Sequence, residues 1–235
     1  EKQAAGKRKG MKRVLITGAN GFLGDSLSAM LLNEGLSVIA TGNGPCRLPY
    51  TGKSGFSYLP MDITDPTAIQ RQIKTAAPDI IVHAAAMSKP DECEQNREKA
   101  FAVNVKGTAD LLEAAALQKA TIVFLSTDFI FDGSTGMYRE EDLPGPVNYY
   151  GQTKLEAELL TRQYPYDYSI ARTVLVYGNN RSGRKNILGM VKDKLERGEP
   201  FKVVDDQLRT PTFIEDLSAG ITKIIRDRAK GIFHI

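Results

Sequence analysis

The sequence predicts an α/β fold with a doubly wound parallel sheet, and three observations point to it. An apolar run at residues 14–17 leads into a turn with three glycines, and an apolar pattern with helical spacing follows that turn. Further apolar runs at 37–41, 80–86 and 121–125 predict buried strands, and helical segments separate them. Strands that alternate with helices form parallel sheets covered on both faces, the arrangement of a Rossmann domain.

The glycine turn is predicted to bind the pyrophosphate of a dinucleotide. A pyrophosphate can approach a helix N-terminus only where no side chain blocks the backbone, so glycines leave free N–H groups facing the anion. A glycine-rich turn without a ligand is the alternative, and the strand and helix on either side argue against it. We assign the whole turn to the cofactor site: Gly18, Asn20, Gly21, Phe22, Leu23 and Gly24.

Length and composition fit one α/β domain with a sizeable core. The chain has 235 residues, of which 25% are charged, and a formal net charge of +3. Part of the positive excess lies in residues 1–10, interpreted as a disordered tail or expression remnant before a natural start at Met11. No apolar run approaches the ~20 residues that span a bilayer, and no signal peptide is recognised. We therefore expect a cytoplasmic protein that binds neither membranes nor nucleic acid.

The loop after the second predicted strand favours NADP over NAD. An NAD-preferring site usually has a carboxylate about 20 residues after the glycines, where it holds the ribose hydroxyls. Residues 42–44 are Gly-Asn-Gly instead, and Arg47 follows. A guanidinium there could bind a 2′-phosphate through two parallel hydrogen bonds. We predict NADP (NADPH) with NAD as the alternative, and a surface arginine without a role is the competing interpretation of Arg47.

Other strand ends are expected to complete the cofactor site, because open α/β sheets bind ligands at the carboxyl ends of their strands. Asp62 follows the third strand near the expected adenine, although it could equally be a turn residue. Alanines end the next strand and leave room for a cofactor ring or phosphate. Asn104 interrupts the apolar face of a helix predicted over residues 94–119, where a buried amide needs partners. The predicted contacts are Asp62, Ile63, Ala84, Ala85, Ala86 and Asn104.

Three residues with reactive side chains are assigned to structure instead of chemistry. His83 lies inside an apolar run, which indicates a core histidine and not an acid or base. Cys46 and Cys93 are far apart and lack ligand-type spacing, so we predict neither a disulfide nor a metal site. Cys93 is interpreted as a small buried filler.

Tyr150 and Lys154 form the predicted catalytic pair. They are four residues apart at the start of a predicted helix and therefore share one face of it. A cation beside a phenol lowers the phenol pKa from about 10 toward the working range of a general acid or base. Upstream, a strand ends in Ser126-Thr127-Asp128, at the edge where ligands bind. The following residues 131–146 have the size expected for a substrate-facing lid.

These motifs resemble the extended short-chain dehydrogenase/reductase family, and within it the dTDP-4-dehydrorhamnose reductases. The similarity runs from Met11 to the last residue. It rests on Gly18-x-x-Gly21-x-x-Gly24, residues 125–133, Tyr150-x-x-x-Lys154 with its flanks, and Asp206-Gln207-x-Arg209-x-Pro211-Thr212. The resemblance implies NADPH- or NADH-dependent reduction of a 4-keto group on a nucleotide-linked deoxysugar.

The resemblance also implies a role for each residue of the catalytic group. Tyr150 would donate a proton to the ketone oxygen, and Lys154 would hold the nicotinamide ribose and lower the pKa of the tyrosine. Thr127 would hydrogen-bond the same oxygen, and Asp128 would position or polarise the site. Residues 172–178 resemble the strand and loop where substrate and the carboxamide end of the cofactor meet.

The family pattern divides the chain into a dinucleotide-binding domain over 11–173 and a substrate-binding portion over 174–235. The latter ends in a predicted strand at 231–235 that returns to the sheet. Members of the family continue past this point, so the substrate portion is expected to be truncated or to lack its lid. The expected partner is a nucleotide-sugar substrate, with a homodimer as an option.

Two other functions stay open at this stage. One is a non-catalytic regulatory subunit resembling the partner of methionine adenosyltransferase, against which the intact Tyr150, Lys154 and Thr127 argue. The other is a different sugar-nucleotide enzyme, such as an epimerase or a 4,6-dehydratase. A dehydratase would be expected to carry an Asp-Glu pair after the strand-end hydroxyl, which Asp128-Phe129 does not supply.

Overall fold

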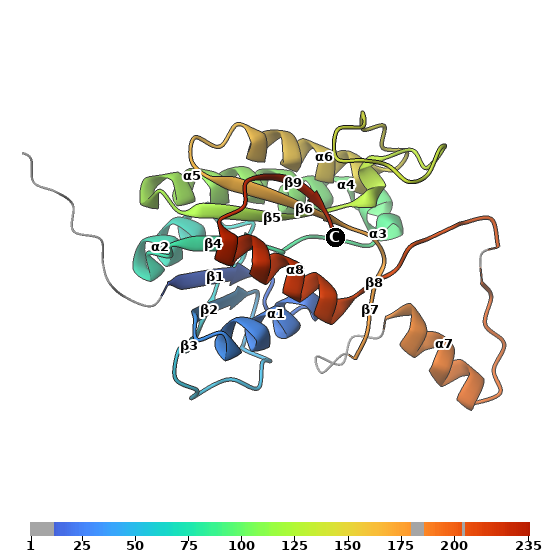
Figure 1. Cartoon of the computed structure of the whole chain (residues 1–235), viewed down its shortest axis with the longest axis horizontal. Helices are drawn as coiled ribbons and strands as arrows, with labels where there is room; N and C mark the ends of the chain where they lie inside the picture. The colour runs from blue at the N-terminus through green and yellow to red at the C-terminus, as the bar shows by residue number, and fades with distance from the viewer. Residues whose placement is uncertain (1–11, 180–185, 204) are drawn as a thin grey trace, which may run out of the picture.

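A seven-stranded parallel sheet forms the centre of the computed structural model, which describes residues 12–179, 186–203 and 205–235. Its strand order is β3-β2-β1-β4-β5-β6-β9, and every neighbouring pair is parallel (Figure 1). The order reverses between β1 and β4, which makes that point the expected ligand crevice. The predicted doubly wound α/β fold is confirmed. The strands are β1 (Arg13–Thr17), β2 (Ser37–Gly42), β3 (Phe56–Pro60), β4 (Ile80–His83), β5 (Thr121–Thr127), β6 (Tyr168–Thr173) and β9 (Gly231–His234).

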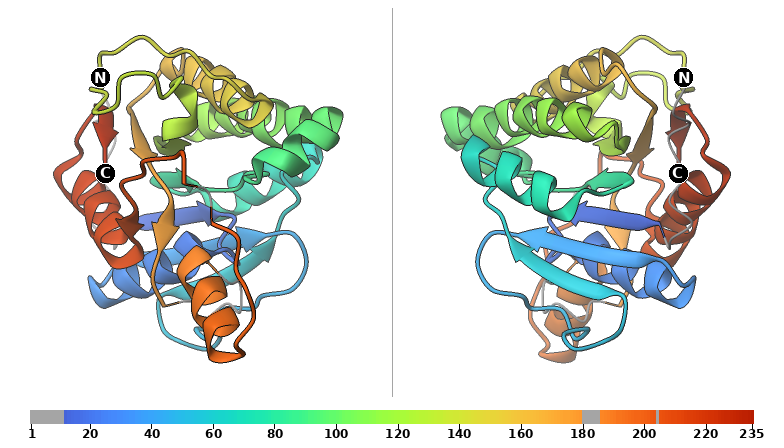
Figure 2. Two further views of the ribbon diagram at one scale, coloured as in Figure 1. Left: turned by 90° about the vertical axis from the view of Figure 1, so that its right-hand side faces the viewer. Right: turned by 90° about the vertical axis from the view of Figure 1, so that its left-hand side faces the viewer.

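Helices cover both faces of the sheet (Figure 2). On one face α1 (Phe22–Asn33) packs beside α8 (Ile214–Asp227). On the other face lie α2 (Pro66–Ala76), α5 (Gly107–Gln118) and α6 (Tyr149–Arg162). These helices seal the apolar strands from water and leave the carboxyl edge of the sheet open for a site.

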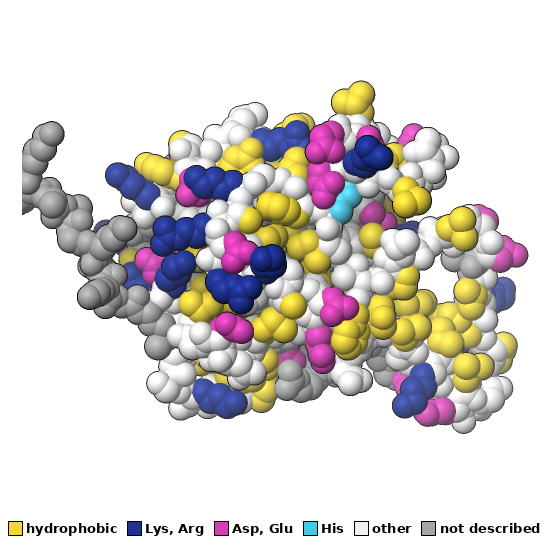
Figure 3. All heavy atoms as spheres, viewed as in Figure 1, with side chains coloured by type: hydrophobic (Ala, Val, Ile, Leu, Met, Phe, Trp, Pro, Cys, Tyr) yellow, Lys and Arg dark blue, Asp and Glu magenta, His cyan; other side chains and the backbone are white. Residues whose placement is uncertain are grey.

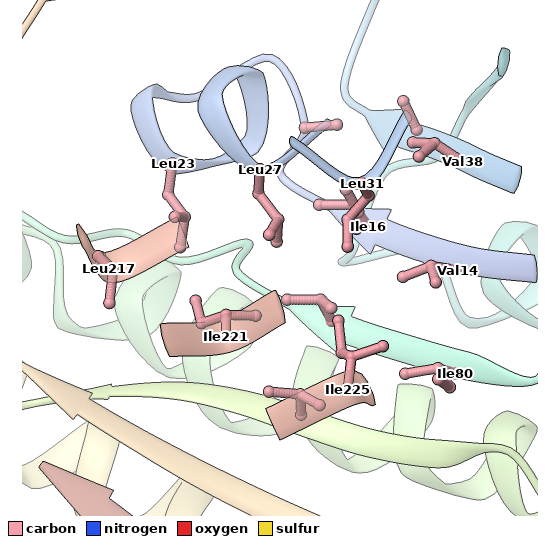
Figure 4. Packing of buried hydrophobic residues seen from close by; sticks show 14 of the residues in the cluster. Val14, Ile16, Leu23, Leu27, Leu31, Val38, Ile80, Leu217, Ile221 and Ile225 are labelled. Carbon is pink, nitrogen blue, oxygen red and sulfur yellow. The ribbon is translucent and has the colours of Figure 1, made fainter. Parts of the chain in front are cut away.

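The core has two halves because successive strand side chains point to opposite faces. Val14 and Ile16 belong to the half under α1 and α8, whereas Leu15 belongs to the half under α2, α5 and α6. In Figure 4, Leu23, Leu27 and Leu31 of α1 face Leu217, Ile221 and Ile225 of α8 above the sheet. Each fully buried leucine or isoleucine contributes roughly 1.5–3 kcal/mol by leaving water. This packing makes α8, from the C-terminal part of the chain, an integral part of the layer that covers this face of the sheet.

Two helix starts follow from capping side chains. Asp65 accepts hydrogen bonds from the backbone of Thr67 (2.9 Å) and Ala68 (3.0 Å), with Pro66 at the first helical position of α2, as predicted. Asn148 accepts from the backbone N–H of Gly151 at 2.8 Å and begins α6. This second cap fixes the helix turn that carries Tyr150.

The stretch over residues 94–119 is helical as predicted, but it is not one regular helix. It contains α3 (Pro90–Gln95), a break at Asn96, α4 (Arg97–Phe101), a π-helical turn (Ala102–Lys106) and then α5. The wider turn places the amide of Asn104 in the interior, where it is 2% exposed. The regular helical periodicity expected from sequence is interrupted at this turn.

The loop over residues 131–146, predicted to be a substrate-facing lid, lies against β6 and β9. The Glu140 carboxylate accepts a hydrogen bond from the backbone of His234 at 2.9 Å, and the Glu140 carbonyl accepts from Arg172 Nη1 at 3.2 Å. These bonds tie the loop to β6 and β9, and none of its residues lines the cavity described below. A short 3-10 turn (Asp128–Ile130) connects it to β5.

The C-terminal part leaves the sheet and then returns to it (Figure 1). β7 (Val176–Tyr177) pairs with β8 (Thr212–Phe213), and α7 (Ile187–Glu196) lies between them in sequence and stands away from the sheet. Hydrophobic side chains are exposed on this segment (Figure 3), including Leu188, Met190, Leu195 and Val203. The predicted returning strand is confirmed as β9. The predicted tail over residues 1–10 lies outside the described residues, and no described helix has the length and apolar character of a membrane span.

Candidate active site

A cavity of about 1000 Å³ opens at the carboxyl ends of the strands. The turn between β1 and α1 forms one wall, and the ends of β2 to β6 and the start of α6 form others. The C-terminal segment contributes residues from α7 to α8. Nearly all the predicted site residues line this one cavity: Gly18, Asn20, Gly21, Phe22, Leu23, Gly24, Arg47, Asp62, Ile63, Ala84, Ala85, Ala86, Thr127, Asp128, Tyr150 and Lys154.

The three glycines are needed by the backbone geometry of the turn. Gly18 has a φ of +66°, and a Cβ there would lie 2.9 Å from the Cα of Ala85. A Cβ on Gly24 would lie 2.4 Å from the Cα of Ala19, so the third glycine lets the helix pack closely against the turn. At Gly21 a Cβ would meet only the carbonyl of Gly18, at 2.9 Å. The turn thus has no side chain at its three points of closest backbone approach and forms a cradle at the N-terminus of α1, a geometry that fits a pyrophosphate.

Two hydroxyl groups in the cavity wall lack a hydrogen-bond partner among the described residues. They are Ser126 Oγ at the end of β5 and Thr173 Oγ1 at the end of β6, and both are buried. Unpaired buried hydroxyls are costly, which is consistent with a polar ligand group beside them. The cradle and these hydroxyls together fit a dinucleotide that extends from the glycine turn to α6.

Tyr150 is buried, 8% exposed, at the inner end of the cavity. The Thr127 hydroxyl acts on its phenol, and its ring meets Phe129 edge-on at 5.6 Å between ring centroids. Burial raises the pKa of Tyr150 well above its ordinary value, and the Thr127 hydroxyl opposes this only in part. The phenol therefore carries its proton at neutral pH.

The structure turns the Lys154 ammonium toward a strand carbonyl, and the effect of Lys154 on the pKa of Tyr150 stays a prediction. The Lys154 ammonium donates to the carbonyl of Leu125 at 2.7 Å and lies 4.1 Å from the centroid of the Phe124 ring. Burial lowers the pKa of Lys154 to about 7, although the Glu158 charge opposes the shift. Spacing four residues apart put both side chains on one helix face, but the strand carbonyl decided where the ammonium points.

Thr127 is the last residue of β5 and Asp128 is the first of the 3-10 turn, one residue beyond the strand end, and both line the cavity with Tyr150. Thr127 Oγ1 donates to Asp128 Oδ1 at 3.0 Å and accepts from the backbone N–H of Phe129 at 3.2 Å. Burial raises the pKa of Asp128, and the Thr127 hydrogen bond and the Arg209 charge oppose that rise. The arrangement gives the inner end of the cavity two hydroxyl groups and a partly desolvated carboxylate.

Arg209 is the site residue that the sequence reasoning left unassigned. Its Nη1 lies 3.5 Å from Asp128 Oδ2, and its guanidinium lies 4.8 Å from the Phe129 ring centroid. The motif that carried the family resemblance contains Arg209, but Asp128 is far away in sequence. Gln207, Phe201 and Ile187 from the same C-terminal segment also line the cavity.

Asn104 is the one predicted contact that the structure does not bring to the cavity lining. Its side chain accepts from the backbone N–H of Met87 at 2.8 Å and donates to the Met87 carbonyl and Thr153 Oγ1, both at 3.0 Å. It therefore ties the segment after β4 to α6. The need for partners at this amide was predicted correctly, and protein groups satisfy it.

The structural roles predicted for His83 and Cys93 are confirmed. His83 is 1% exposed and its ring nitrogens hydrogen-bond Thr17 Oγ1 at 2.8 Å and Thr108 Oγ1 at 2.9 Å. Burial, helped by the Lys154 charge, lowers the pKa of His83 to about 3, so the ring is neutral. Cys93 is fully buried, and both cysteines are free thiols.

Comparisons with known proteins agree with this geometry. Residues 11–235 match the family model described as the RmlD substrate binding domain. The methionine adenosyltransferase 2 subunit beta of Xenopus tropicalis is 30% identical over 229 residues, which cover 95% of this chain and 66% of that protein. The spore coat polysaccharide biosynthesis protein SpsK of Bacillus subtilis (strain 168) is 33% identical, covering 96% of this chain and 73% of that protein.

A solved structure extends the likeness to the fold. The dTDP-4-dehydrorhamnose reductase of Bacillus anthracis str. Ames, in complex with NADP, superposes with a TM-score of 0.81 and 30% identity, covering 96% of this chain and 74% of that one. The chain thus spans between 66% and 74% of the lengths of the subunit beta and the reductase it matches. The resemblance to the dTDP-4-dehydrorhamnose reductases is confirmed, and the chain belongs to the RmlD substrate-binding domain family.

Proposed function

We propose that this protein catalyses the NADPH-dependent reduction of the 4-keto group of a nucleotide-linked deoxysugar, as a dTDP-4-dehydrorhamnose reductase does. The observation that carries the proposal is the position of Tyr150. This buried, protonated phenol lines the same cavity as Thr127 and the glycine turn. The likeness to a reductase solved with NADP supports the choice of cofactor and reaction.

The chain's own residues would hold the cofactor in three places. The N–H groups around Gly18 and Gly21 would bind the pyrophosphate at the N-terminus of α1. Arg47 would bind the 2′-phosphate, with NADH as the weaker alternative. Lys154, at the inner end, would hold the nicotinamide ribose. When bound, the reduced nicotinamide supplies a hydride to the carbonyl carbon of the substrate.

Tyr150 supplies the other half of the reduction. Its phenol donates a proton to the ketone oxygen as the carbon–oxygen double bond becomes a single bond, which leaves an alcohol and a phenolate. The Thr127 hydroxyl hydrogen-bonds the same oxygen and stabilises its developing charge. The pKa of Lys154 is about 7, so a fraction of the molecules carries a buried ammonium at neutral pH. That positive charge would favour the phenolate over the neutral phenol. A proton from solvent then restores the phenol.

A regulatory role is a second candidate, favoured by the similarity to methionine adenosyltransferase 2 subunit beta. In that role the protein would bind the dinucleotide and a protein partner without turnover. The retained Tyr150, Thr127 and Lys154 favour the enzyme but do not exclude this role, because a binding subunit can keep such residues.

One experiment separates the two functions. NADPH oxidation is followed with a panel of 4-keto sugar nucleotides, dTDP-4-dehydrorhamnose included, beside a pull-down with a methionine adenosyltransferase catalytic subunit. Consumption of NADPH that depends on the keto sugar supports the reductase. Stoichiometric capture of the partner with no consumption of NADPH would replace the reductase with the regulatory subunit.

A further inference from the structure

We infer that Asn20 and Tyr58 form a clamp that fixes the loop over residues 42–47 and so positions Arg47 to select a 2′-phosphorylated dinucleotide. The inference deepens the proposed function and rests on it, because it concerns how this chain discriminates NADPH from NADH. Asn20 and Tyr58 are positioning residues that act through Arg47.

The side chain of Asn20 hydrogen-bonds the loop through both its oxygen and its nitrogen. Its Oδ1 accepts a hydrogen bond from the backbone N–H of Arg47 at 2.9 Å, and its Nδ2 donates to the carbonyl of Pro45 at 2.9 Å. The same Nδ2 donates to the Tyr58 hydroxyl, also at 2.9 Å. Asn20 is 5% exposed and lies in the glycine turn itself. The residue thus joins the pyrophosphate cradle to the segment that carries Arg47.

Tyr58 closes the clamp from β3. Its hydroxyl lies within hydrogen-bond distance of the carbonyls of Gly42 (3.1 Å) and Gly44 (2.9 Å), while it accepts from Asn20. Burial raises the pKa of Tyr58, and the Asn20 hydrogen bond and the positive charge of Arg47 oppose that rise. The positive charge of Arg47 thus acts on the Tyr58 phenol, and Arg47 also lines the cavity.

The clamp also occupies the place where an NAD-selecting carboxylate would begin. A Cβ built on Gly42, the last residue of β2, would lie 3.2 Å from the Tyr58 hydroxyl and 3.4 Å from Asn20 Nδ2. The distance to the Tyr58 hydroxyl is shorter than ordinary van der Waals contact, and the distance to Asn20 Nδ2 is at the lower limit of such contact. An acidic side chain at this strand end, which elsewhere holds the ribose hydroxyls, would crowd the clamp. Asn20 and Tyr58 therefore disfavour an acidic side chain at the end of β2, as an NAD site has, and support the loop that carries Arg47, as expected for an NADP site.

Holding the backbone of Arg47 before the ligand arrives reduces the entropy lost on binding. Without the clamp, the loop has to be ordered by the 2′-phosphate itself. NADH has no such phosphate, so loosening the loop should weaken NADPH binding and leave NADH binding nearly unchanged.

The test is a double-mutant cycle on nucleotide affinity, measured by fluorescence titration of the full chain with NADPH and with NADH. Tyr58→Phe removes the hydroxyl together with its bonds to Asn20 and the loop carbonyls. It should weaken NADPH binding about 3- to 10-fold, with less than about 2-fold change for NADH. In an Arg47→Ala background the same substitution should change NADPH affinity less than about 2-fold, because the residue through which it acts is gone. Asn20→Ala is the second variant; because Asn20 also lies in the glycine turn, the expectation for it is a larger loss of affinity for NADPH than for NADH.

The matched control is Tyr164→Phe. The Tyr164 hydroxyl donates to the carbonyl of Ala120 at 2.7 Å, and Tyr164 does not line the cavity. This variant loses one buried phenol hydrogen bond and should leave the NADPH to NADH affinity ratio unchanged. Thermal melts confirm that each variant is folded.

Each outcome has a separate meaning. Equal weakening of NADPH and NADH by Tyr58→Phe, or the same loss with and without Arg47, would overturn the clamp. A wild-type protein that binds both nucleotides equally would overturn it too, while leaving the reductase standing. A wild-type protein that binds neither nucleotide would overturn the reductase proposal together with the clamp.

Discussion

The two ends of the cavity hold their polar groups by different means. We call the end beside the glycine turn and the loop over residues 42–47 the outer end, and the end beside Tyr150 and Lys154 the inner end. At the outer end, Asn20 and Tyr58 are neutral side chains that saturate loop carbonyls and one loop N–H. At the inner end, Tyr150 and Lys154 are ionisable groups kept away from water, and burial is the largest cause of both pKa shifts. One end is organised by hydrogen-bond geometry and the other by desolvation.

The difference teaches which property each end can control. A hydrogen-bonded loop fixes the position of a charged side chain such as Arg47, and that position governs which nucleotide binds. A desolvated phenol and amine have protonation states that are unlike those in water, and so govern proton transfer. Substitutions at one end should therefore change binding selectivity, and those at the other end should change chemistry and pH dependence.

The largest effect should come from removing the proton donor at the inner end. Tyr150→Phe is expected to lower the rate of keto-sugar reduction by at least about 100-fold, while NADPH affinity stays within about 2-fold, since only the acid is lost. The matched control is Tyr149→Phe, at the neighbouring tyrosine, which should retain turnover. Rates come from NADPH oxidation and affinities from fluorescence titration. Undiminished turnover in Tyr150→Phe would show that Tyr150 is not the proton donor.

A second test asks whether the inner end is truly desolvated. Folded Lys154 loses its proton near pH 7, whereas the unfolded chain keeps it to about 10.4, so the unfolded state binds more protons between these values. The free energy of unfolding of wild type relative to Lys154→Met should therefore rise with pH by about 1.4 kcal/mol per unit from about pH 7 to 10, and stay level below pH 7.

Urea unfolding at a series of pH values measures this difference. Lys106→Met replaces an exposed lysine and should show no such rise relative to wild type. A flat difference between wild type and Lys154→Met across the window would mean that the ammonium is solvated, and the contrast between the two ends would disappear.

The smallest of the three effects is expected at the outer end. Arg47→Ala should weaken NADPH binding by about 10-fold, through the loss of a charge-assisted contact, and leave NADH within about 2-fold. Arg71→Ala removes an exposed arginine of α2 that does not line the cavity, and should change neither affinity. Parallel losses for NADPH and NADH would show that Arg47 does not read the 2′-phosphate.

Periodicity predicted most of the sheet and its helices. The strands at 37–41 and 121–125 and the helix after the glycine turn were found where expected, because alternating strands and helices of this kind have few ways to bury their apolar faces. The π-helical turn around Asn104 was missed, and the partners of the buried amide in it, Met87 and Thr153, lie elsewhere in the sequence. The position of the loop after β5 was missed because long-range bonds to Arg172 and His234 hold it.

By itself the sequence determined the strand, glycine turn and helix, and the pairing of Tyr150 with Lys154 on one helix face, because these follow from local spacing. Only the tertiary structure decided that the Lys154 ammonium turns to the Leu125 carbonyl and that Arg209 reaches Asp128. It also decided that Asn20 and Tyr58 hold the Arg47 loop. Those contacts join residues far apart in the chain, and burial, which shifts the pKa values of the inner end, exists only once the layers have packed.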